Sequence, residues 1–161
     1  NGASGLAFGF LDEKRSVNRE LTKKMADLVH GYGREAVFHR AFDVTDDPFK
    51  AVETLIDCGL NRLLTSGKKA TAFEGRYLIR QLEERYGSYI EIMAGSGISA
   101  SNVRELAEYT GVKSIHASCR GYKIDHTASS ADVSFSYQND DQYEATDLKK
   151  VEELVREFKR C

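Results

Sequence analysis

Apolar and polar positions alternate between two patterns along the chain. Short apolar runs of strand length are followed by longer stretches in which apolar residues recur at helical spacing. The predicted strands lie at 6–11, 36–42, 62–65, 89–94 and 114–118. The predicted helices, caps included, lie at about 18–32, 47–59, 70–86, 101–111 and 146–160.

Local signals support the predicted helix ends. Asn18 and Asp47 are good N-cap residues, and Pro48 stands in a first turn, where a missing N–H costs nothing. Gly59 and Gly111 stand where a helix would stop in the left-handed conformation.

Alternating strands and helices predict a parallel sheet with helical crossovers. Two α/β architectures fit: an open doubly wound sheet and a TIM-type (β/α) barrel. A closed barrel needs eight units in about 250 residues, and three further units would add about 75 to 90 residues. The chain enters a strand almost at once and has no initiator Met. We therefore expect a single domain over 1–161 that is an incomplete barrel, with about five βα units present and the N-terminal units missing.

The stretch before the last helix differs from the repeat. No Lys or Arg occurs between Lys123 and Lys149, whereas six acidic residues do. We expect a polar acidic loop over 121–145, which is either a solvated connection or a lid over the barrel mouth.

Composition narrows the classes of partner. The net charge of −2 and the lack of a basic stripe argue against nucleic acid, and the apolar runs are too short to span a bilayer. The cysteines are Cys58, Cys119 and Cys161, an odd number without a secretory signal, so we expect reduced thiols in the cytoplasm.

The end of the second strand carries the first candidate site. His39, Arg40 and Asp43 follow an apolar run, which is where a barrel places its chemistry. Strand alternation puts His39 and Asp43 on one face and Arg40 on the other. In the functional interpretation His39 is an acid/base, Arg40 binds an anion and Asp43 orients them. In the structural interpretation they are an interior histidine, a salt bridge and a turn cap.

Two later strand ends offer further ligand-binding groups. Thr65 and Ser66 supply hydroxyls, although such a pair is also common in a plain strand-to-helix connection. Gly95, Ser96 and Gly97 follow what would be the seventh barrel strand, where backbone amides often bind phosphate. The same glycines would also suit a simple tight turn.

The last strand end combines an imidazole with a thiol. His116 and Ser118 share one face as candidate ligand-binding residues, and Cys119 lies on the other face if the strand continues. His116 with Cys119 is a candidate Cu(I) pair, because Cu(I) prefers soft sulfur ligands.

Four segments in this order resemble the CutC copper homeostasis family: FHRAFD at 38–43, LTSG at 64–67, IMAGSGI at 92–98 and IHAS at 115–118. The resemblance implies a TIM-type barrel, a cytoplasmic and often oligomeric protein, and Cu(I) binding. Two departures stand out. The family's opening strands, which carry cysteines discussed as copper ligands, are absent, and no Met follows Ser118.

Three hypotheses follow. The first is a cytoplasmic, CutC-like copper homeostasis protein that binds copper ions. The second is a TIM-barrel enzyme acting on a small anionic or phosphorylated ligand, and the third is a structural subunit of a homo-oligomer. The sequence leaves open whether the chain is an enzyme.

Overall fold

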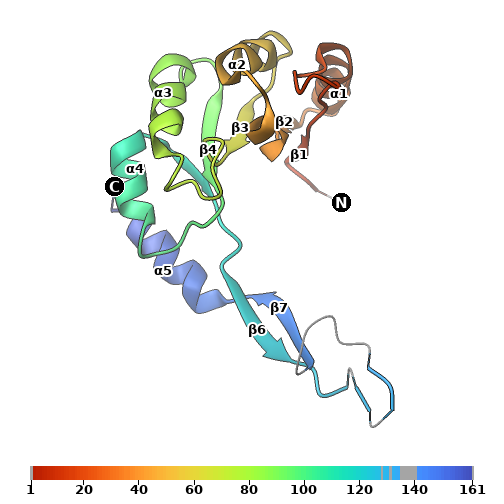
Figure 1. The fold of residues 1–161 in the computed structure, drawn as a ribbon, viewed down its shortest axis with the longest axis vertical. Coiled ribbons are helices and arrows are strands. Elements are labelled where there is room, and N and C mark those ends of the chain that lie inside the picture. The colour runs from red at the N-terminus through yellow and green to blue at the C-terminus, as the bar shows by residue number, and fades with distance from the viewer. Residues whose placement is uncertain (1, 128, 131, 135–140, 161) are drawn as a thin grey trace.

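The chain forms four strand-then-helix steps and a fifth strand in one parallel sheet, and a two-stranded hairpin separates that fifth strand from the last helix (Figure 1). A computed structural model describes residues 2–127, 129–130, 132–134 and 141–160. The sheet has the order β1-β2-β3-β4-β5, and every neighbouring pair is parallel. Its strands are β1 (Gly5–Phe8), β2 (Glu35–Phe38), β3 (Arg62–Thr65), β4 (Glu91–Gly95) and β5 (Ser114–His116). The expected partial TIM-type barrel is confirmed, and the barrel is not closed.

The helices begin and end close to the predicted signals. They are α1 (Arg19–Gly31), α2 (Pro48–Asp57), α3 (Arg76–Tyr86), α4 (Val103–Thr110) and α5 (Leu148–Phe158). Asn18 accepts a hydrogen bond from the amide of Leu21 at 3.1 Å, which caps α1. The Asp47 carboxylate accepts from two amides in the first turn of α2. Gly111 follows α4 in the left-handed conformation at φ 78°.

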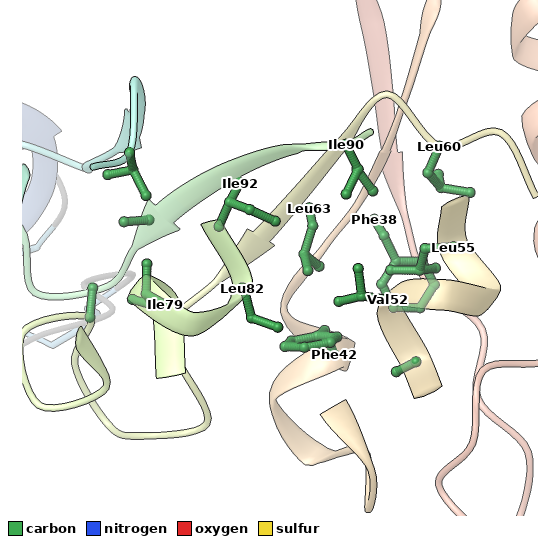
Figure 2. Close-up of a cluster of buried hydrophobic side chains, with 14 of the residues drawn as sticks. Phe38, Phe42, Val52, Leu55, Leu60, Leu63, Ile79, Leu82, Ile90 and Ile92 are labelled. Atoms are coloured by element: carbon green, nitrogen blue, oxygen red, sulfur yellow. The ribbon is translucent and has the colours of Figure 1, made fainter. Parts of the chain in front are cut away.

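The core lies between the sheet and the helices. Alternate strand residues such as Phe38, Leu63 and Ile92 are fully or almost fully buried. They pack against helix residues such as Leu55 and Leu82 (Figure 2). The side chains between them on each strand are only half-buried on the opposite face, as expected for the interior side of a barrel that is not closed.

The second predicted strand gives way to a short helix. The strand predicted at 36–42 ends at Phe38, and Arg40–Val44 forms the short 3-10 helix η1. The His39 side chain caps this helix by accepting a hydrogen bond from the amide of Ala41 at 3.1 Å. This side-chain bond competes with the extended conformation, so strand alternation stops at His39.

Three other predicted elements also change their bounds. The strand predicted at 6–11 is present as β1, which ends at Phe8. The helix predicted at 70–86 begins only at Arg76, because Thr71 and Glu74 bond each other's amides in a separate turn. The strand predicted at 114–118 ends at His116, which leaves Ser118 and Cys119 outside the sheet.

The segment predicted as an acidic loop over 121–145 contains strands at both ends. Strands β6 (Arg120–Ile124) and β7 (Gln142–Thr146) pair in antiparallel register and project away from the five-stranded sheet (Figure 1). The loop prediction overlooked apolar residues that alternate with polar ones, as at Tyr122 and Ile124. The helix expected at 146–160 is present as α5, whereas Cys161 lies outside the described residues.

Within the described part of the chain, no helix combines the length and the apolar character needed to cross a membrane.

Candidate functional site

The Asp43 carboxylate joins the carboxyl ends of β2 and β3. It accepts hydrogen bonds from the Thr65 hydroxyl at 2.6 Å, Arg40 Nε at 2.8 Å and the Ser66 hydroxyl at 2.9 Å. The backbone amides of Ser66 and Lys68 also donate to it, each at 3.1 Å. The Asp43 side chain is 8% exposed, so these groups replace almost all of its water. Its oxygens are engaged as acceptors, which suits a positioning role better than proton abstraction from a ligand.

The environment of Asp43 favours its charged form. Burial alone would raise the pKa of this carboxyl. Hydrogen bonds from Thr65, Arg40, Ser66 and Lys68 outweigh that effect and hold the pKa below its ordinary value. Asp43 is therefore an ionised carboxylate at neutral pH.

Asp43 fixes the guanidinium of Arg40 at the edge of the site. Arg40 Nε binds Asp43, and Arg40 Nη2 donates to the Ser66 hydroxyl at 2.8 Å. The Arg40 side chain is still 43% exposed. Among the residues that the structure describes, Arg40 Nη1 has no hydrogen-bond partner, so it can donate to a ligand. Arg40 and Asp43 lie together, and the predicted placement on opposite strand faces is wrong, because η1 brings residues i and i+3 to the same side.

His39 is held in one orientation beside this group. Its Nδ1 accepts from the amide of Ala41, so the neutral ring carries its proton on Nε2. Gly9 lies against the ring, and a Cβ at that position would lie 2.6 Å from His39 Cε1. Sequence reasoning did not select Gly9. From the sequence, Gly9 lies inside the strand predicted at 6–11, and a glycine within a strand pattern is a signal of close backbone approach.

The hydroxyls of Thr65 and Ser66 are engaged within the protein. Both residues are fully buried, and Thr65 donates to Asp43. The Ser66 hydroxyl lies within hydrogen-bond distance of Asp43 and of the Lys69 carbonyl. Lys68, which sequence reasoning also missed, reaches the carbonyls of Thr45 and Asp46 with its ammonium group. These contacts fix the loop after β3 against η1.

The loop after β4 packs against the segment that precedes α3. The Ser96 hydroxyl donates to the Ala70 carbonyl at 2.8 Å, and Gly97 has φ 66°. A Cβ at Gly97 would lie 2.8 Å from Thr71 Cγ2, and one at Gly95 would lie 2.6 Å from a Leu64 methyl group. Close packing therefore explains both glycines, and the Ser96 side chain points into this packing contact.

Comparison with known proteins decides the family. The sequence model of the CutC family matches residues 1–121. The chain belongs to the CutC family. A CutC family protein of Histophilus somni is 32% identical over 98% of this chain and 65% of its own length. A CutC family protein of Glaesserella parasuis is 36% identical over 96% of this chain and 63% of its own length.

A solved CutC structure supports the same assignment. The CutC of Streptococcus agalactiae, which is named for a proposed role in copper homeostasis, shares 31% identity and a TM-score of 0.64 with this chain. The match covers 70% of this chain and 55% of that protein. The chain thus spans less than two thirds of the length of these CutC relatives.

The candidate copper ligands of this CutC chain lie at the end of β5. His116 is exposed, and Cys119 is a half-exposed free thiol. Ser118 and Cys119 line a pocket of about 420 Å³. Cys58, the other free cysteine of the described residues, is buried. Over the described residues there is no group of three or more His, Cys, Asp or Glu side chains that could hold a metal ion.

Proposed function

We propose that this chain is part of a cytoplasmic copper homeostasis protein and contributes Cu(I) ligands from the end of β5. Membership of the CutC family supports the role, because a solved relative is named for it. The observation that carries the proposal is the Cys119 thiol, which is free and half-exposed and follows the exposed His116 by three positions in the chain. Unpaired thiols also suit a reducing compartment.

The end of β5 makes this pair more suitable than strand alternation predicts. On a continuing strand, residues 116 and 119 would point to opposite faces. The strand ends at His116, and Cys119 turns the backbone at φ 44°. Strand geometry therefore does not force the two side chains to opposite faces. A thiolate together with an imidazole is a donor set that Cu(I) accepts.

Cuprous titration of the reduced protein tests the copper role. We expect stoichiometric Cu(I) binding against a competing chelator, and we expect Cys119→Ser to abolish it. Cys58→Ser is the matched control, because that thiol is buried. If Cys119→Ser retains full affinity, or if no tight copper is found, the role is removed from this chain.

A second candidate function is binding of a small anionic ligand at the end of β2. Arg40 supports it, because its guanidinium is oriented by Asp43 and Ser66 yet remains exposed. His39 would supply an acid at Nε2 if the ligand is a substrate. A thermal-shift screen of phosphorylated metabolites tests this function. We expect a stabilising ligand whose effect disappears in Arg40→Gln and in His39→Ala, and a blank screen would contradict it.

We also propose that the chain associates with a second copy of itself. Over the described residues the five-stranded sheet ends at β1 and β5, and an open strand edge is a template for pairing. Next to β1, the apolar side chains of Leu6, Leu28 and Tyr32 are exposed. Association of two copies would cover this surface.

A further inference from the structure

A pocket lies at the carboxyl ends of β4 and β5. It does not include His39, Arg40 or Asp43, the residues that follow β2. It has a volume of about 420 Å³, within the range of small-molecule sites. Its walls come from the loop between β4 and α4, from the chain after β5, and from α5. The lining residues are Ile98, Ser99, Ala100, Ser101, Ser118, Cys119, Arg120, Lys150 and Glu153.

The loop wall of this pocket offers hydroxyls in a fixed arrangement. The Ser99 and Ser101 hydroxyl oxygens lie 2.8 Å apart. The Asn102 side chain holds the loop by accepting from the Ser99 amide at 3.0 Å and donating to the Gly97 carbonyl at 2.9 Å. Ser118 adds an exposed hydroxyl from the wall that the chain after β5 forms. Hydroxyl donors from two walls can therefore converge on one ligand.

The charged side chains of the pocket are Lys150, Arg120 and Glu153. Lys150 Nζ donates to the Arg120 carbonyl at 2.6 Å, which fixes the ammonium and leaves it further N–H groups. The Arg120 guanidinium already pairs with Glu144 at 2.6 Å. Lys150 is then the main cation and Glu153 the main anion. A bare anion would meet attraction and repulsion together.

A ligand with an anionic end and a hydroxylated end suits this distribution. Its phosphate would accept from Lys150 and from the serine hydroxyls, and its own hydroxyl groups would donate to Glu153. The loops after the seventh and eighth strands of a complete barrel commonly bind phosphate, and β4 and β5 would be those strands if three units precede this chain. We propose that this pocket binds the phosphomonoester of a small polyhydroxy compound. This inference goes beyond the anionic-ligand function at Arg40, because it places a phosphate in a second pocket, beside the loop that follows Gly95, Ser96 and Gly97.

Titration calorimetry on the full chain with glycerol 1-phosphate tests the proposal. We expect saturable binding that Lys150→Gln weakens by about tenfold or more, since a charge-assisted hydrogen bond is lost. Lys149→Gln is the matched control, because the neighbouring lysine lies outside this pocket. Glycerol should not bind. Inorganic phosphate should bind Glu153→Gln more tightly than the unchanged protein, because a repelling charge is removed.

The outcomes separate this pocket from the group at β2. Binding that is unchanged in Lys150→Gln but lost in Arg40→Gln overturns the pocket and keeps the anionic-ligand function. If neither glycerol 1-phosphate nor any other phosphorylated compound binds, both are overturned. Unfolding of Lys150→Gln, followed by circular dichroism, should match that of Lys149→Gln, so that a loss of binding reports on the pocket.

Discussion

Replacement of Asp43 by Asn tests the central group of the candidate site. Asn keeps the size of the side chain but turns one acceptor oxygen into an NH₂ donor. One carboxylate oxygen faces Thr65 Oγ1 and the amides of Ser66 and Lys68, and the other faces Arg40 Nε with the Ser66 amide and hydroxyl. Whichever way the amide turns, its NH₂ group faces at least two donors.

The expected cost follows from these contacts. Hydrogen bonds to a charged group contribute roughly 1.5–3 kcal/mol each, and the unmet donors add a desolvation cost. Arg40 is partly exposed, so water replaces part of its lost ion pair. We expect Asp43→Asn to lower the free energy of unfolding by about 2–4 kcal/mol at pH 7.

The effect of pH gives an independent check. The pKa of Asp43 is lowered in the folded state, so its contribution is present above the unfolded pKa, near 3.9, and is lost as pH falls through the folded value. The difference in unfolding free energy between the unchanged protein and Asp43→Asn should stay constant from about pH 6 to 8 and shrink below about pH 4.

Urea unfolding followed by circular dichroism measures both effects. The control is Asp46→Asn, because the Asp46 side chain is exposed and pairs with Arg15 at the surface at 2.6 Å. That variant should cost less than about 1 kcal/mol. A cost below about 1 kcal/mol for Asp43→Asn at pH 7, or a difference that does not change with pH, would refute the reasoning.

Three further predictions address packing, capping and association. Gly75→Ala should destabilise strongly in urea unfolding, since its Cβ would lie 1.9 Å from the Ser66 carbonyl oxygen, whereas Gly31→Ala meets nothing within 4 Å and should be neutral or stabilising. Asp47→Ala should cost about 0.5–2 kcal/mol through the lost cap of α2, measured in the same way. Light scattering should give a dimer mass that falls toward the monomer in Leu28→Glu, and a monomer at all concentrations of the unchanged chain would contradict self-association.

The sheet was predictable because its signal is local. Each strand of the five-stranded sheet occupies an apolar run between segments whose apolar residues recur at helical spacing. The predicted ranges therefore overlap all five strands. Asn18 and Asp47 cap their helices as expected, because an N-cap bond joins residues only a few positions apart. Strand ends were harder, since they depend on side chains. The His39 side chain ends β2 by accepting a hydrogen bond from the amide of Ala41. Neither the spacing of apolar residues nor β propensity predicts such a bond.

The candidate site was predicted in its residues but not in its arrangement. His39, Arg40, Asp43, Thr65 and Ser66 were all selected from the sequence. Asp43 finds its partners 22 to 25 positions later in the chain, and the sequence alone does not show such pairing. The same limit hid the β6–β7 hairpin, whose register joins segments on either side of an acidic stretch.

The two candidate functions occupy different strands and can be separated experimentally. Arg40 follows β2, whereas His116 and Cys119 lie at β5, and β3 and β4 stand between them. Three strand spacings amount to about 14 Å, which exceeds the range over which substitutions usually couple. Arg40→Gln should therefore leave Cu(I) affinity unchanged, and Cys119→Ser should leave anion binding at Arg40 unchanged. Mutual dependence of the two would contradict this separation and would mean that the two sites are coupled.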